Sequence, residues 1–160
     1  MNYKLFAPKE FWELDWQHYI KKQCNGCGNS STKSLTKKIG FNMDRIIFVN
    51  VRPACGIHDW QYTSPRTLGI EPSHEHRMSC DRIFFNNLIR IVDTEGERLK
   101  SWAITKWLRR RICNAYYLAV KTFGGNSYWE ANNRQEEYRE VCSYNLWKDE
   151  KNDDFYARSA

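Results

Sequence analysis

The stretch RPACGIHDWQY, residues 52–62, places Cys55, His58 and Asp59 within five positions of one another. A neighbouring His and Asp can ligate a metal ion, perform base chemistry or cap a helix. If this stretch is a helix, residues three and four apart share a face, so Cys55, His58 and Tyr62 can meet one ligand or partner.

Asp81 is a second residue that could do chemistry, in the largely apolar stretch SCDRIFF. A helix is predicted from about Ser73, which suits an N-cap, and an unpaired carboxylate inside that helix would be costly to bury. Asp81 could pair with Arg77 or Arg82 of its own helix. If the two predicted helices lie antiparallel, Asp81 could instead accept a hydrogen bond from His58 and leave the other ring nitrogen free as a base.

Two kinds of metal site are compatible with this region. Asp59 can offer a carboxylate to a hard cation such as calcium, which takes six to eight oxygen ligands, and the loop NGCGNS, residues 25–30, can add backbone carbonyls. Alternatively, the spacing fits a four-ligand structural zinc site made of Cys24, Cys27, Cys55 and His58. In that alternative the basic chain would be a nucleic-acid-binding module and would hydrolyse no ester.

Three stretches, NGCGNS, CGIHDWQY and CDRIFFNNL, follow one another in the order of the secreted phospholipase A2 superfamily, and the chain resembles most closely its short bacterial and phage-type members. The resemblance covers roughly residues 24–92. It implies a mostly α-helical, phospholipase A2-like fold, with two antiparallel active-site helices beside a calcium loop. It also implies calcium-dependent hydrolysis of a glycerophospholipid acyl ester.

Carried over residue by residue, the resemblance makes His58 the base that activates a water. Asp81 orients His58, and Tyr62 braces Asp81. A phospholipase-like fold that binds lipid or a partner protein without turnover is the remaining alternative.

The resemblance also implies a calcium site, formed by the Asp59 carboxylate and the backbone carbonyls of Gly26, Gly28 and Ser30. It implies a disulfide between Cys27 and Cys55. Asn29, Ser30 and Ser31 stand where further glycines are usual in the animal enzymes, and the interval between His58 and Asp81 leaves no room for those enzymes' extra β-hairpin.

The rest of the chain is predicted to add helices on either side of this region. Pro8 and Pro53 each suit the first turn of a helix, and Gly124 and Gly125 are well placed to end the last one. The predicted elements are a helix over 8–22, a strand over 45–51, helices beginning near residues 53 and 73, the second ending near 93–97, a helix over 99–123, and a partly helical tail with a disordered acidic end.

Two expectations concern the last helix, and one concerns the histidines outside the motif. Trp102, Trp107 and Tyr116 are predicted to be core aromatics. The basic triplet at 109–111 is predicted to be a solvated face that could attract anionic headgroups. His18, His74 and His76 are expected at the surface or at helix caps.

The composition indicates the class of partner. The chain has 160 residues, which suits a single domain over 1–160, and a formal net charge of +6, which favours anionic partners. We expect a glycerophospholipid substrate at a membrane or micelle surface, anionic lipid as a partner, and no nucleic acid. No run approaches the roughly 18 apolar residues of a membrane span, no signal peptide is evident, and the redox state of the six cysteines stays open.

Overall fold

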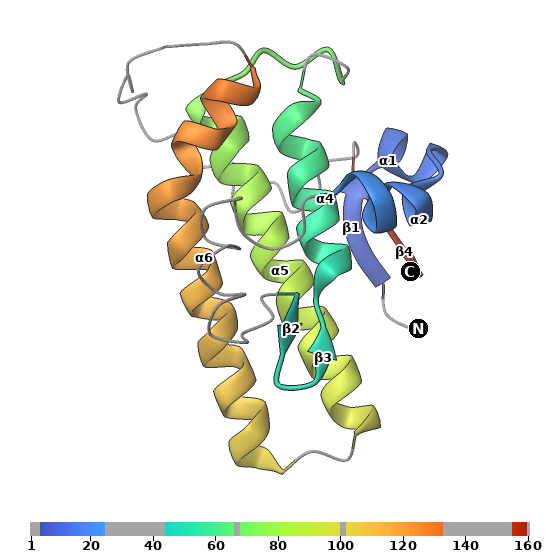
Figure 1. The fold of residues 1–160 in the computed structure, drawn as a ribbon, viewed down its shortest axis with the longest axis vertical. Coiled ribbons are helices and arrows are strands. Elements are labelled where there is room, and N and C mark those ends of the chain that lie inside the picture. The colour runs from blue at the N-terminus through green and yellow to red at the C-terminus, as the bar shows by residue number, and fades with distance from the viewer. Residues whose placement is uncertain (1–3, 25–43, 66–67, 100–101, 133–154, 160) are drawn as a thin grey trace.

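The computed structural model describes residues 4–24, 44–65, 68–99 and 102–132, and the backbone of 155–159. Its main feature is a layer of three helices, α4 (Arg52–Thr63), α5 (His74–Arg98) and α6 (Ala103–Ala131). Figure 1 shows them side by side, each running opposite to the one before it. The fold is mostly α-helical, as predicted, and the helices carrying His58 and Asp81 are antiparallel neighbours.

The N-terminal segment differs from the single helix predicted over 8–22. It forms a strand and three short helices: β1 (Lys4–Pro8), α1 (Lys9–Glu13), α2 (Trp16–His18) and the π-helix η1 (Tyr19–Gln23). Leu14 is extended, at φ −76° and ψ 165°, which ends α1. The Asp15 side chain then accepts a hydrogen bond from the His18 N–H and begins α2. Asp15 therefore caps a second helix, and the first helix does not continue through it.

Strand β1 pairs antiparallel with β4 (Phe155–Ser159), so that Lys4 lies opposite Ser159. A strand at 155–159 was not predicted. The predicted tail over 133–154 lies outside the described residues.

The run RIIFVNV, predicted as one strand, folds back on itself. It forms the antiparallel pair β2 (Arg45–Ile46) and β3 (Val49–Asn50), joined by a two-residue turn. Both turn residues, Ile47 and Phe48, have positive φ, of 43° and 69°. A two-residue hairpin turn needs this backbone shape, which Asn and Gly supply more readily than Ile and Phe.

Three glycines lie inside helices, where the sequence predicted that the helices would end. Gly124 and Gly125 are internal to α6, and Gly96 is internal to α5, which runs on to Arg98. A Cβ placed on Gly124 would lie 2.7 Å from the Tyr62 hydroxyl oxygen. Glycine is needed there for a close approach between α6 and α4, and a glycine inside a helix does not by itself end it.

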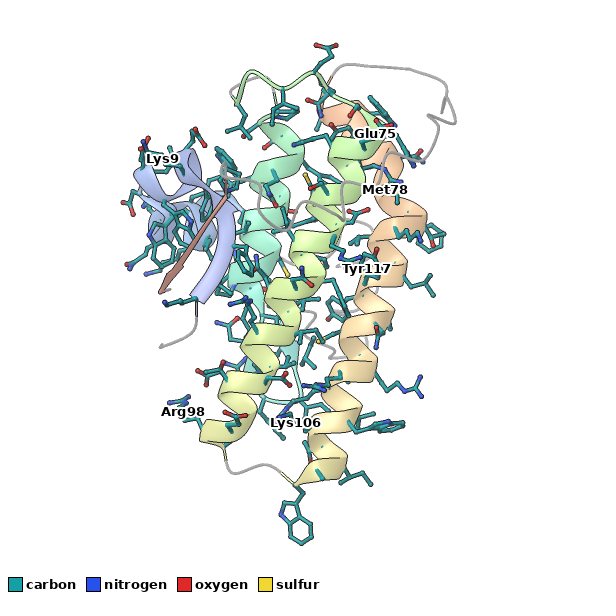
Figure 2. The ribbon with its side chains drawn as sticks, turned by 180° about the vertical axis from the view of Figure 1, so that it is seen from behind. Lys9, Glu75, Met78, Arg98, Lys106 and Tyr117 are labelled. Atoms are coloured by element: carbon teal, nitrogen blue, oxygen red, sulfur yellow. The ribbon has the colours of Figure 1, made fainter. Side chains whose placement is uncertain are left out.

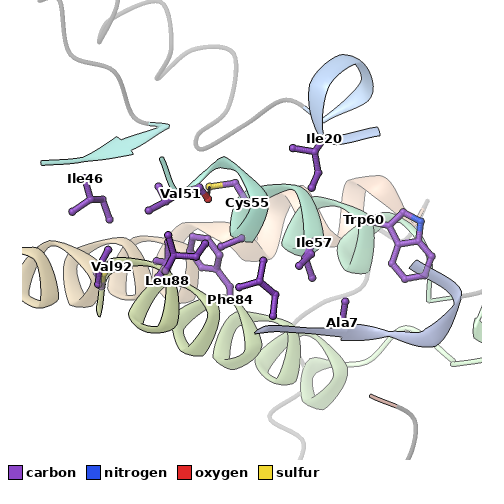
Figure 3. Packing of buried hydrophobic residues seen from close by; sticks show 14 of the residues in the cluster. Ala7, Ile20, Ile46, Val51, Cys55, Ile57, Trp60, Phe84, Leu88 and Val92 are labelled. Carbon is purple, nitrogen blue, oxygen red and sulfur yellow. Dashed lines mark hydrogen bonds between the residues drawn. The ribbon is translucent and has the colours of Figure 1, made fainter. Parts of the chain in front are cut away.

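The main core lies where α4, α5, the β2–β3 hairpin and β1 meet (Figure 3). On α5 the buried side chains recur at Phe84, Leu88, Ile91 and Val92, the three-and-four spacing of one helix face. Ile83, on the same helix, is only half-buried. Among the described ranges, no helix combines the length and the hydropathy needed to cross a membrane.

Two predicted core aromatics lie at the surface. Trp102 is 82% exposed and Trp107 is 56% exposed, whereas Tyr116 packs against the core. The basic triplet at 109–111 was predicted to be solvated. Arg110 and Arg111 are exposed, but Arg109 is buried.

Candidate active site

His58 of α4 and Asp81 of α5 form a buried pair. Nε2 of His58 lies 2.9 Å from Oδ1 of Asp81, and the two side chains are 8% and 1% exposed. A carboxylate can only accept a hydrogen bond, so the arrangement places a proton on Nε2. The other ring nitrogen, Nδ1, makes no hydrogen bond within the part of the chain that the structure describes.

Tyr62 lies one turn after His58 on α4 and reaches the same carboxylate oxygen. Its hydroxyl donates a 2.5 Å hydrogen bond to Oδ1 of Asp81, and its ring centroid lies 4.1 Å from that of His58. Burial, followed by the charge of Asp81, raises the pKa of Tyr62 well above its ordinary value. The phenol therefore stays a hydrogen-bond donor, and Tyr62 lies where the sequence predicted it.

Arg77 completes the surroundings of Asp81. It lies one turn earlier on α5, is 4% exposed, and places Nη1 3.4 Å from Oδ2 of Asp81. The same nitrogen donates to the backbone carbonyl of Lys121 on α6, at 3.3 Å. The sequence presented a pair with Arg77 and a pair with His58 as alternatives, but Asp81 makes both, because Oδ1 faces α4 and Oδ2 faces Arg77 on its own helix. We call His58, Tyr62, Arg77 and Asp81 the His58 cluster.

The surroundings of this cluster are apolar and aromatic. The Phe84 ring lies 4.8 Å from the His58 ring, and Tyr128 of α6 lies against Tyr62 at 5.2 Å between centroids. Packing on both sides limits rotation of the imidazole. A histidine with one nitrogen bound to a buried carboxylate and the other unbonded can act as a general base.

A second buried group, adjacent to the cluster, was not predicted. The Ser73 hydroxyl accepts from the His76 N–H, which confirms Ser73 as the N-cap of α5. The His76 ring, expected at the surface, is instead buried. Its Nδ1 lies 2.9 Å from the Tyr128 hydroxyl, and its Nε2 lies 3.6 Å from the Cys80 sulfur. Burial lowers the pKa of His76 to about 4. The only sign of this buried group in the sequence was that a polar residue, His76, lies one turn into the predicted helix, on a face predicted to be buried.

The predicted calcium ligands are only partly within the described residues. Asp59 is half-buried beside Cys24, whose thiol donates to Oδ2 at 3.4 Å. Burial, then the charges of Asp59 and Cys24, raise the pKa of Tyr19 to about 12. Gly26, Gly28 and Ser30 lie outside the described residues. Asp59 thus supplies one hard oxygen donor, of the kind calcium prefers, and carbonyl ligands would have to complete the set.

The zinc alternative gains no support from the described part of its ligand set. Across the described ranges, no three His, Cys, Asp or Glu side chains come together to hold a metal ion, although Cys24, Cys55 and His58 all lie within them. Cys80 and Cys113 are free thiols, whereas Cys55 takes part in a disulfide bond. A sulfur in a disulfide cannot serve as a thiolate ligand. Cys27, the predicted partner of Cys55, lies outside the described residues.

No family model, curated protein or solved structure matches this chain. Any function must therefore be argued from the geometry of the site itself.

Proposed function

We propose that the chain is a phospholipase A2-like hydrolase that cleaves an acyl ester of a glycerophospholipid. The observation that supports this most directly is the 2.9 Å pair of His58 Nε2 and Asp81 Oδ1 in a buried, aromatic surrounding. That pair orients the ring and leaves Nδ1 without a protein partner in the described residues. A water molecule can occupy the position beside Nδ1.

In the proposed reaction, Nδ1 of His58 takes a proton from this water while the water oxygen attacks the ester carbonyl carbon. The resulting imidazolium is stabilised by its hydrogen bond to the Asp81 carboxylate. It then returns the proton to the departing glycerol oxygen as the carbon–oxygen bond of the ester breaks. The products are a free fatty acid and a lysophospholipid.

Tyr62 and Arg77 have positioning roles in this scheme. Their hydrogen bond and ion pair hold the Asp81 carboxylate at both of its oxygens, which restrains its rotation away from His58. They touch Asp81, and through it they fix the direction of the His58 ring.

Calcium is part of the proposal, held by Asp59 with the carbonyls of Gly26, Gly28 and Ser30. When bound, the ion would supply positive charge to the phosphate and to the oxyanion that develops on the carbonyl oxygen. Asp59 follows His58 directly in α4.

The test is fatty-acid release from mixed phospholipid micelles, measured in calcium at roughly the millimolar level of weak sites and again with excess chelator. We expect release only with calcium, and a loss of about 10²- to 10⁴-fold in His58→Gln, the range for removal of a general base. His18→Gln, at an exposed histidine, is the matched control and should keep full activity.

Undiminished release by a folded His58→Gln protein would refute the mechanism, and release that survives the chelator would refute the calcium requirement. If the folded chain releases no fatty acid but binds phospholipid, it is a phospholipase-like protein without turnover. Stoichiometric zinc together with DNA binding would instead favour the nucleic-acid-binding module.

A further inference from the structure

Exposed hydrophobic side chains gather where α5 passes into α6. Of the nine large hydrophobic residues found exposed in the described chain, six lie either on the β2–β3 turn or between the end of α5 and the second turn of α6. Figure 1 shows the hairpin in the same half of the molecule as the connection from α5 to α6. We call five of them the docking end: Phe48, Trp102, Ile104, Trp107 and Leu108, whose exposed fractions are 84%, 82%, 72%, 56% and 44%.

The backbone holds Phe48 outward at a conformational cost. Phe48 has φ 69° and Ile47 has φ 43°, a region that side-chain-bearing residues rarely occupy. Arg109 of α6 is buried and its guanidinium donates twice to the Ile47 carbonyl, at 3.3 Å and 3.1 Å. The strained turn is therefore fixed against α6 through Arg109.

The charges next to these side chains favour an anionic partner. Between residues 103 and 129, helix α6 carries five charged residues and all are basic: Lys106, Arg109, Arg110, Arg111 and Lys121. Arg110 is paired with Asp93, and Lys106 approaches Glu97 at 3.6 Å. Arg111 lies over the Trp107 ring instead, at 5.2 Å from its centroid. A guanidinium stacked on an exposed Trp is placed to meet a phosphate while the ring enters an apolar layer.

This combination matches a lipid surface better than the other anionic partners. Trp, Ile, Leu and Phe side chains at an exposed helix end, flanked by Arg, are typical of elements that lie in the headgroup region of a bilayer. A nucleic acid would gain little from an exposed Ile104 and Leu108. An exposed apolar patch of this extent marks an interaction site.

We propose that the docking end binds the surface of an anionic phospholipid membrane, with the Trp102, Ile104 and Trp107 side chains in the headgroup region and Arg111 on lipid phosphates. This surface is separate from the His58 cluster. From Asp81 to Arg98, the last residue of α5, the helix extends about 25 Å at about 1.5 Å per residue. Figure 2 places Arg98 and Lys106 at one end of the helices and Glu75 and Met78 at the other. The proposal therefore does not depend on hydrolysis.

The test is cosedimentation of the full chain with phosphatidylcholine vesicles and with vesicles containing about a third phosphatidylglycerol, near 0.1 M salt so that screening does not mask the charge term. We expect binding to the anionic vesicles, reduced at least about tenfold by Trp102→Ala with Trp107→Ala. The matched control removes exposed hydrophobic groups elsewhere, with Leu14→Ala and Phe123→Ala, and should leave binding unchanged.

A charge variant tests the proposed contact between Arg111 and lipid phosphates. Arg111→Gln should lower binding to the anionic vesicles about fivefold and leave any binding to neutral vesicles as it was, because a basic residue near such a surface contributes about that factor. His58→Gln should bind anionic vesicles as the parent chain does, which separates this proposal from the proposed hydrolysis.

Three results would overturn the proposal. The first is no binding, or equal binding to both vesicle types. The second is a dimer, seen by size-exclusion chromatography, that Trp102→Ala with Trp107→Ala dissociates while vesicle binding stays the same. The third is DNA binding that these substitutions abolish in place of vesicle binding.

Discussion

The two ends of the three-helix layer depart from the usual partition of side chains in opposite directions. Around the His58 cluster, the polar and charged side chains are buried: Arg77 is 4% exposed and Asp81 is 1% exposed. At the docking end, the apolar side chains are exposed: Trp102 is 82% exposed and Phe48 is 84% exposed. Charges belong in water and large apolar groups out of it, so both arrangements carry a free-energy cost.

The difference lies in what offsets that cost. Asp81 has His58, Tyr62 and Arg77 as partners, so the molecule itself supplies the compensation. At the docking end, Trp102 and Phe48 remain exposed in the described chain, and any compensation has to come from a partner. The cluster is therefore a prearranged site, and the docking end is a surface prepared for association. The predictions below test this contrast, beginning with the largest expected effect.

Arg77→Leu should lower the free energy of unfolding by about 3–5 kcal/mol, because it leaves Asp81 buried without its ion-pair partner. The matched change at the docking end is Arg110→Leu, whose side chain is 51% exposed and 2.6 Å from Asp93. A surface pair of this kind contributes about 0–1 kcal/mol. Urea denaturation measures both. Equal losses would mean that the buried pair has no special role in stability.

The His76 site predicts a loss of stability in mild acid. Burial lowers the pKa of His76 to about 4, whereas the unfolded chain binds that proton near pH 6.5. Between these values the unfolded state holds more protons, so stability is complete above about pH 6.5 and falls as the pH drops toward 4. The full effect is about 3 kcal/mol.

Urea midpoints from about pH 7.5 down to about pH 4.5 would measure this slope. His76→Gln should remove the contribution of His76 to this slope. Tyr128→Phe keeps the His76 ring buried, so that variant should retain the contribution. A slope of the same size in His76→Gln would assign the acid sensitivity to other groups.

Two glycines allow the same substitution to be compared at the two ends. At Gly124 a Cβ would meet the Tyr62 hydroxyl at 2.7 Å, and at Gly96 it would meet the Nη1 end of the Arg109 side chain at 3.0 Å. Gly124→Ala should cost about 1–3 kcal/mol through overpacking, and should also lower fatty-acid release by displacing Tyr62 from Asp81. Gly96→Ala should be near neutral, because a flexible side chain can move and Ala favours a helix over Gly by about 1 kcal/mol.

Thermal denaturation and the release assay measure this pair of variants. If Gly124→Ala kept full stability and full release, the close contact between α6 and Tyr62 would not position the cluster.

The helices and the central pair were predictable because local chemistry determines them. Pro53 and Ser73 lie at the starts of α4 and α5, and the spacing of His58 and Tyr62 is that of one helix face. An aspartate within an apolar helix face needs a partner, and this requirement pointed to His58. The second partner, Arg77, was treated only as an alternative, because spacing cannot show that a carboxylate is bonded from two sides.

Most errors in the prediction concern contacts between segments distant in sequence, and one concerns a local turn. Gly124 was interpreted as a helix end because its contact with Tyr62 depends on the packing of α6 against α4. The sequence alone does not show that packing. Trp102 and Trp107 were assigned to the core from residue type alone, although the inward face of α6 is defined by Arg109 and Cys113. Strand β1 was missed because its partner lies at the other end of the chain. The hairpin was missed because Ile-Phe is not a typical turn sequence.

At that unusual turn a substitution should raise stability by a small amount. Phe48 is 84% exposed at φ 69°, so its side chain contributes little packing while its backbone is strained. Phe48→Gly should raise the free energy of unfolding by about 1 kcal/mol, because glycine adopts positive φ without the steric penalty. Phe48→Ala removes the same ring but keeps a Cβ, and should give no such gain. Both variants should bind anionic vesicles more weakly, so thermal denaturation separates them while cosedimentation does not. If Phe48→Gly gained stability and kept full vesicle binding, the strain would have no function in docking, and Phe48 would have to be removed from the docking end.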